Sequence, residues 1–195
     1  VRDARRRGLD ARYLKPVQTG DDSDTATVRA LAGVDADRAP LPPLHLALPA
    51  SVDQAAEAEG VTVGAADLLA RTRAELARAP GAAWVLETAG GLLVPLNARE
   101  TQADLLRALG APTVLVAKSG LGTLNHTLLT VEAMRRRGLG LRALLLVGEH
   151  HEANVRTLRA RLGTLPLFEL PPLTPVDAGA LDAWLDANDL EALWR

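Results

Sequence analysis

The sequence predicts a three-layer α/β protein, in which a mostly parallel sheet is covered by helices on both faces. Short apolar runs alternate with longer stretches whose apolar residues recur at helical spacing. The runs are almost continuously apolar, which is typical of strands buried on both faces. Connections of about 20 residues fit helical crossovers between parallel strands. The chain is long enough for one well-buried domain, so we expect residues 1–195 to form a single domain.

Six apolar runs, several bounded by Gly or Pro, are the predicted strands. They cover residues 11–14, 44–48, 83–86, 113–117, 143–147 and 166–170. The amphipathic stretches are the predicted helices, at residues 24–32, 65–79, 101–109, 124–137, 152–162 and 178–193. The opening residues indicate a further helix that ends at Gly8. Residues 35–53 contain four prolines and are predicted to form a long loop with at most one short strand.

Several helices have recognisable starts or faces. Ser23 or Asp24 could cap the helix that begins there. In residues 65–79, Leu68 and Leu76 belong to an apolar face, with Arg and Glu on the opposite side. These patterns indicate helices with one buried face and one solvent-exposed face.

Composition excludes several classes of function. The net charge of −2, with three Trp, one Tyr and one Phe, leaves neither a basic stripe nor many stacking platforms for nucleic acid. No apolar run reaches the ~20 residues needed to cross a membrane. The absence of cysteine excludes disulfides and thiolate metal sites and fits a cytoplasmic protein. No G-x-S-x-G or H-E-x-x-H motif supports a serine hydrolase or a zinc enzyme.

Polar residues that could take part in binding or catalysis follow the predicted strands. In parallel sheets, ligands bind beyond the carboxyl ends of the strands. We therefore expect one sheet edge to gather Lys15, Glu87, residues 118–125, Gly148 and Pro171.

Lys15 and two acids indicate a phosphate and metal site. Lys15 is one of only two lysines and precedes a proline in K-P-V-Q-T-G. Glu87 ends an apolar strand and is followed by two glycines that could form an anion-binding concavity. With Asp24 it offers the two carboxylates by which Mg²⁺ is commonly held beside nucleotide phosphates. The alternatives are that Glu87 caps a turn and that Asp24 caps its helix.

A glycine-rich turn, S-G-L-G-T-L-N-H, leads into the helix at residues 124–137. Free N–H groups and the helix dipole could bind an anion there, or Thr123 could simply cap the helix. His126 is interpreted as a surface or packing residue.

A metal site at His150 and His151 is disfavoured because adjacent side chains diverge.

Four motifs in this order resemble dethiobiotin synthetases over about residues 8–173: K-P-V-Q-T-G, S-D-T, E-T-A-G-G-L-L-V-P-L and G-L-G-T-L-N-H-T-L-L-T. The resemblance implies a P-loop NTPase-like fold, a homodimer, and ATP and Mg²⁺ dependence. It also implies closure of a ureido ring on 7,8-diaminopelargonic acid with CO₂ or bicarbonate. A carbamate formed on one amine attacks the γ-phosphate, and the neighbouring amine then closes the ring and expels phosphate.

The resemblance also implies a role for each motif. Lys15 matches the catalytic lysine, and Thr19 a second substrate contact. Asp24 and Glu87 match the metal ligands at the nucleotide. Further nucleotide contacts are implied for Thr88, Ala89, Gly90, Leu170, Pro171 and Pro172. Contacts to the substrate carboxylate across the dimer interface are implied for Gly122, Thr123, Leu124 and Asn125.

Two departures from the family pattern qualify this assignment. Neither lysine lies in a G-x-x-x-x-G-K-[ST] loop. Since the chain opens on Val within a helix, we expect a strand, the P-loop and part of that helix upstream. We expect the 195 residues alone to bind ATP poorly and not to turn over. Val147 and Gly148 stand where many relatives carry a base-reading pair.

Two other functions remain as alternatives. One is a non-catalytic remnant of the fold that acts as a binding module. The other is an ATP-dependent domain similar to cobyrinate or cobyrate synthases. The second is weakened because K-P-V-Q-T-G and G-L-G-T-L-N-H occur together.

Overall fold

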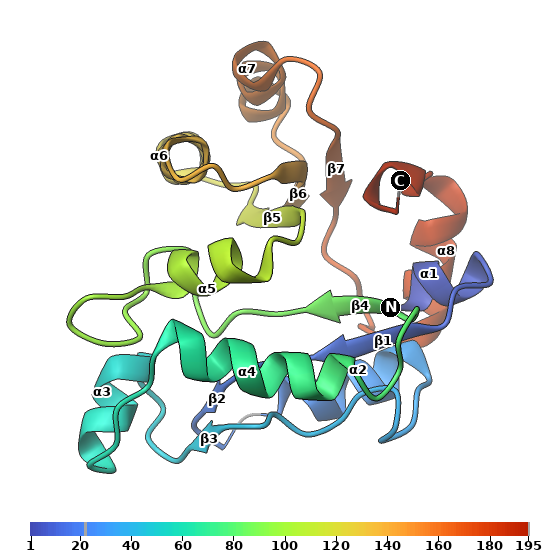
Figure 1. Ribbon diagram of the computed structural model, residues 1–195. Helices are drawn as coiled ribbons and strands as arrows, with labels where there is room; N and C mark the ends of the chain where they lie inside the picture. Colours follow the sequence, from blue (N-terminus) through green and yellow to red (C-terminus); the bar gives the residue numbers. More distant parts are fainter. Residues whose placement is uncertain (22, 195) are drawn as a thin grey trace. The chain divides into compact units, whose positions relative to one another are not determined.

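The computed structural model describes residues 1–21 and 23–194. It divides into two compact units, Val1–Leu109 and Gly110–Arg195, which are described separately. Strands alternate with helices in both units, and every ladder between named strands in the described residues is parallel (Figure 1). The predicted α/β class is thus confirmed, whereas the expectation of a single domain stays a prediction.

The first unit holds two short parallel ladders. Strand β1 (Ala11–Leu14) pairs with β4 (Ala83–Leu86), and β2 (Gln18–Thr19) pairs with β3 (His45–Leu46). Its helices are α1 (Arg2–Arg6), α2 (Asp24–Ala32), α3 (Val52–Ala58), α4 (Ala65–Leu76) and α5 (Gln102–Leu109).

Strand β1 is covered on both faces. Tyr13 and Leu14 are adjacent, so their side chains point to opposite faces of the strand, yet only 2% and 0% of them are exposed. Tyr13 packs with Ala32 at the end of α2 and with Ala39 in the following loop. Such burial on both sides explains why the strand is almost continuously apolar.

The second unit holds a three-stranded parallel sheet in the order β5 (Thr113–Lys118), β6 (Leu141–Val147), β7 (Leu167–Leu170). Leu144 and Leu146 of β6 pack with Val131 and Leu158. These partners belong to helices α6 (Thr123–Arg136) and α7 (Glu152–Leu162). Both helices therefore cover the same face of β6.

Most predicted elements are confirmed, with some differences. Strand β2 was not predicted, and β6 begins at Leu141 and not at Ala143. Helix α3 was not predicted. It begins at the end of the expected loop at residues 35–53 and buries Val52, Ala55 and Ala56 in the core of the first unit. Helix α4 ends at Leu76 and not at Ala79.

The predicted helix at residues 178–193 is interrupted. It consists of α8 (Ala178–Ala187) and the 3₁₀ helix η1 (Glu191–Leu193). The break falls at Asn188, whose backbone is extended and whose side-chain amide donates to the carbonyl of Trp184. Within residues 1–21 and 23–194, no helix is long and apolar enough to cross a membrane.

Candidate active site

Lys15 lies between two carboxylates in the first unit. Its side chain is almost entirely buried and forms an ion pair with Asp24, while its Nζ is 3.8 Å from Oε1 of Glu87. Lys15 directly follows strand β1, Glu87 directly follows strand β4, and Asp24 lies in the first turn of α2. The three charged residues singled out from the sequence therefore meet at one place.

Ser23 explains why Asp24 is available to Lys15. The Oγ of Ser23 accepts the backbone N–H of Ala26 at 3.0 Å, so Ser23 is the N-cap of α2. Of the two capping alternatives, the structure thus selects Ser23. The Asp24 carboxylate lies in the first helical turn, where the helix dipole favours a negative charge.

Tyr13 is a contact of Glu87 that sequence reasoning missed. Its hydroxyl donates to Oε2 of Glu87 at 2.7 Å. Burial, the hydrogen bond to Glu87 and the nearby negative charges of Glu87 and Asp24 raise the pKa of Tyr13 well above its ordinary value. No local sequence signal pairs Tyr13 with Glu87, because the contact depends on the register of β1 against β4.

The turn after Glu87 is tight and depends on glycine. The hydroxyl of Thr88 donates to the carbonyl of Gly90 at 2.9 Å, and Gly90 has a φ of +84°. A Cβ on Gly90 would lie 3.0 Å from Cγ2 of Val94. Buried Ala89 is held through its carbonyl, which accepts from Nε2 of Gln102 at 3.1 Å. The expected nucleotide contacts Thr88, Ala89 and Gly90 thus share one compact turn.

Thr19 lies in β2, beside a second constrained glycine. Gly20 has a φ of +74°, and a Cβ there would lie 2.8 Å from Cβ of Pro49. The Gly20 carbonyl is 2.8 Å from Nε2 of His45. Within the described residues, no hydrogen bond joins Thr19 to Lys15, so the structure does not bring this pair of expected substrate contacts into direct contact.

The second unit contains the expected anion-binding turn. Gly122, with a φ of +89°, is the N-cap of α6, so the alternative that Thr123 caps the helix is wrong. Instead, Oγ1 of buried Thr123 lies 3.2 Å from Oγ1 of Thr127. Leu124 and Asn125 follow in the first turn of the helix, with Asn125 exposed.

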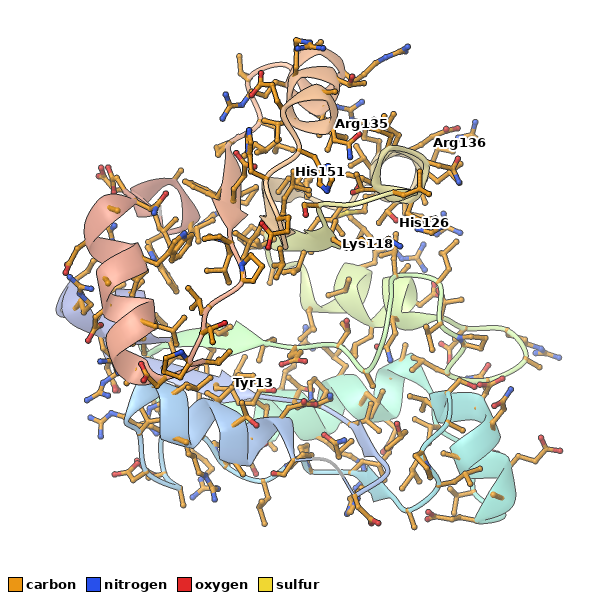
Figure 2. All side chains as sticks on the ribbon, turned by 180° about the vertical axis from the view of Figure 1, so that it is seen from behind. Tyr13, Lys118, His126, Arg135, Arg136 and His151 are labelled. Carbon is orange, nitrogen blue, oxygen red and sulfur yellow. The ribbon has the colours of Figure 1, made fainter. Side chains whose placement is uncertain are left out.

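Two basic side chains flank this turn. A Cβ on Gly122 would lie 3.7 Å from Cε1 of His126 and 3.9 Å from Cε of Lys118, and Figure 2 shows both side chains near the start of α6. They border a hollow of about 230 Å³ between β5 and α6. Its other lining residues are Leu115, Val116, Ala117, Thr123, Thr127 and Thr130.

The turn after β6 is packed against the turn after β5. Gly148 has a φ of +125°, and a Cβ there would lie 2.7 Å from Oγ of Ser119. Its backbone N–H donates to the carbonyl of Leu170 at 3.0 Å. Pro171 and Pro172 follow Leu170 and are exposed. The positive φ and the close approach of Ser119 both favour glycine at position 148.

The two adjacent histidines lie in different surroundings. His150 places Nδ1 2.8 Å from Oε1 of Glu169 and Nε2 3.3 Å from Oε2 of Glu152. The hydrogen bond to Glu169 and its charge are the main causes that raise the pKa of His150. His151 lies beside Gly120 instead. In the part of the chain that the structure describes, no three His, Cys, Asp or Glu side chains are grouped as metal ligands.

Comparison with known proteins connects these features to one family. A family profile described as "AAA domain" matches residues 3–180. The chain is 44% identical over 181 residues to the ATP-dependent dethiobiotin synthetase BioD of Anaeromyxobacter dehalogenans (strain 2CP-C), covering 88% of this chain and 80% of that relative. It is 41% identical to the BioD of Rhizorhabdus wittichii, covering 90% of this chain and 81% of that relative. It is 40% identical to the biotin biosynthesis bifunctional protein BioCD of Bordetella avium, covering 91% of this chain and 37% of that relative.

Proposed function

Because the chain belongs to the dethiobiotin synthetase family, we propose that Lys15, Asp24 and Glu87 form the charged centre of an ATP-dependent ligase that makes dethiobiotin in biotin biosynthesis. The proposed substrates are 7,8-diaminopelargonic acid, CO₂ or bicarbonate, and ATP. The products are dethiobiotin, ADP and phosphate. The observation that carries the proposal is the meeting of both carboxylates at the Lys15 ammonium.

Lys15 suits a reaction in which negative charge builds up between a carbamate and a phosphate. Its ammonium carries three donors on a flexible stem, so it can follow a charge that moves. It is almost entirely buried, and a preorganised cation stabilises a transition-state charge more strongly where water is excluded. Lys15 is therefore the proposed catalytic residue, with Thr19 as a further substrate contact.

Asp24 and Glu87 are chemically suited to hold Mg²⁺. Their oxygens already converge on one cation, the Lys15 ammonium, and carboxylate oxygens are the protein ligands that Mg²⁺ prefers. When bound with ATP, the ion would neutralise part of the charge of the phosphates. The proposed nucleotide contacts are the turn Thr88–Ala89–Gly90 and, on the base side, Leu170, Pro171 and Pro172.

The turn at the start of α6 is the proposed site for the substrate carboxylate. The backbone N–H groups of this turn lie at the positive end of the helix dipole, at residues Gly122, Thr123, Leu124 and Asn125. The N–H of Thr123 already donates to the carbonyl of Gly120 at 3.1 Å. We propose that a second copy of the chain completes this contact, so that the enzyme is a homodimer, and that it works in the cytoplasm.

An assay of product formation tests the proposal. The full reading frame that encodes these residues should convert diaminopelargonate and bicarbonate to dethiobiotin, detected by mass spectrometry, only when ATP is present. Absence of product with all three substrates and Mg²⁺ would contradict the proposal and favour a non-catalytic binding module.

A further inference from the structure

Tyr13 contacts the proposed metal ligand Glu87, although no motif singles it out. Its hydroxyl donates to Oε2 of Glu87 at 2.7 Å. The other oxygen of that carboxylate, Oε1, is 3.8 Å from Nζ of Lys15. The two oxygens of Glu87 therefore face different partners.

The geometry points to Tyr13 as a positioning residue for Glu87. Its hydroxyl holds Oε2 of Glu87 and so directs Oε1 toward the cation position that Glu87 shares with Asp24. This inference rests on the function proposed above. Tyr13 acts through Glu87, so it is not itself a catalytic residue.

The fold gives the Tyr13 hydroxyl a fixed position. Tyr13 is paired with Val85 in the β1–β4 register, and Glu87 stands two residues beyond Val85 on the same face. The ring is 2% exposed and packs against Ala32, Val34 and Ala39.

Glu87 needs such a restraint. Its side chain is 48% exposed, and an unrestrained glutamate can rotate about three side-chain torsions. The Tyr13 hydroxyl is a neutral hydrogen-bond donor to this carboxylate. Because this donor is neutral, it can hold Oε2 without neutralising the negative charge with which Oε1 binds a cation.

Carbon-13 NMR can detect the contact without turnover. The chain contains one tyrosine, so labelling tyrosine Cζ yields one resonance. We expect Glu87→Gln to shift this resonance, because the charged acceptor is replaced by a neutral amide. Glu75→Gln, which changes a carboxylate paired with Arg78 near the C-terminal end of α4, should leave it in place. An unchanged resonance in Glu87→Gln would overturn the inference.

Calorimetry tests whether the contact matters for metal binding. In the full reading frame, we expect Tyr13→Phe to raise the Mg²⁺ concentration that half-saturates MgCl₂-dependent ATP binding by about 3- to 10-fold, as loss of a hydrogen bond to a charged group should. Thr72→Val removes another buried hydroxyl of the same unit, one that donates to Leu68, and should not change this concentration.

Equal Mg²⁺ requirements in Tyr13→Phe and Thr72→Val would overturn the positioning role. Neither readout depends on product formation. Failure of the full reading frame to make dethiobiotin would therefore contradict the proposed function alone.

Discussion

The Lys15 ammonium lies 3.8 Å from Oε1 of Glu87 and is also paired with Asp24, so two partly exposed carboxylates share one buried cation. A buried charge is costly unless it is paired. The two ion-pair contacts therefore offset part of the cost of burying the Lys15 ammonium. The Asp24 and Glu87 oxygens that contact Lys15 are also the ones proposed to bind the metal at the nucleotide phosphates.

Replacing Lys15 should affect the chemical step more than binding. In the full reading frame, we expect Lys15→Gln to lower kcat by ~10²-fold or more while leaving ATP binding largely intact, because a transition-state charge partner is lost. Steady-state kinetics and calorimetry measure the two effects. Arg71→Gln, which removes an exposed cation of the Arg71–Asp67 pair on α4, is the control. A change confined to the substrate KM would refute this role.

Replacing Glu87 should affect ATP binding only when the metal is present. We expect Glu87→Gln to weaken Mg²⁺–ATP binding by about 10-fold, since an amide oxygen is a poorer ligand for a hard cation. Titrations with MgCl₂ and with EDTA, on Glu87→Gln and Glu75→Gln in parallel, measure the difference. The same loss of affinity with and without metal would exclude a metal ligand at this position.

Gly148 should be intolerant of any side chain. We expect Gly148→Ala to lower the free energy of unfolding by about 2–3 kcal/mol, because the added Cβ combines a positive φ with a contact to Ser119 Oγ at 2.7 Å. Gly138→Ala, with a φ of +66° and no atom within 4 Å of the new Cβ, should cost only about 1 kcal/mol.

Urea denaturation compares these two glycine variants with the double variant Gly148→Ala/Ser119→Ala. The double variant should recover part of the loss, because it removes the Oγ that the new Cβ meets. Equal losses in Gly148→Ala and Gly138→Ala would show that the contact with Ser119 is unimportant.

His150 should make stability depend on pH. Its pKa is raised above the ordinary 6.5, chiefly by the hydrogen bond to Glu169. A raised pKa in the folded state means that the contribution is full below about pH 6.5 and is lost as the pH rises through the folded pKa. We expect the Tm difference between the parent and His150→Ala to shrink between acidic and alkaline pH. A difference that grows with pH would contradict this sign.

The sequence predicts the elements well where local pattern and burial agree. Strands β1 and β4 and helices α2 and α7 have the predicted bounds, because a strand buried on both faces needs an apolar run and an amphipathic helix needs one apolar stripe. Helix α3 was missed because seven residues carry little periodic signal.

In the site, too, the sequence could identify some features and not others. Lys15, Asp24 and Glu87 could be selected from the sequence, since each is a charge at the end of an apolar run or at the start of a helix. The contact of Tyr13 with Glu87 could not, because it depends on the register of β1 against β4.

The sequence by itself therefore determined the alternation of strands and helices, the charged residues of the site and the family resemblance, since these depend on residue type and spacing along the chain. Tertiary structure alone decided that Ser23 and not Asp24 caps α2, that Tyr13 holds Glu87, and that Gly148 must make room for Ser119. The physical reason is that hydrogen bonds and close contacts between distant segments depend on strand register and packing, which local sequence does not specify.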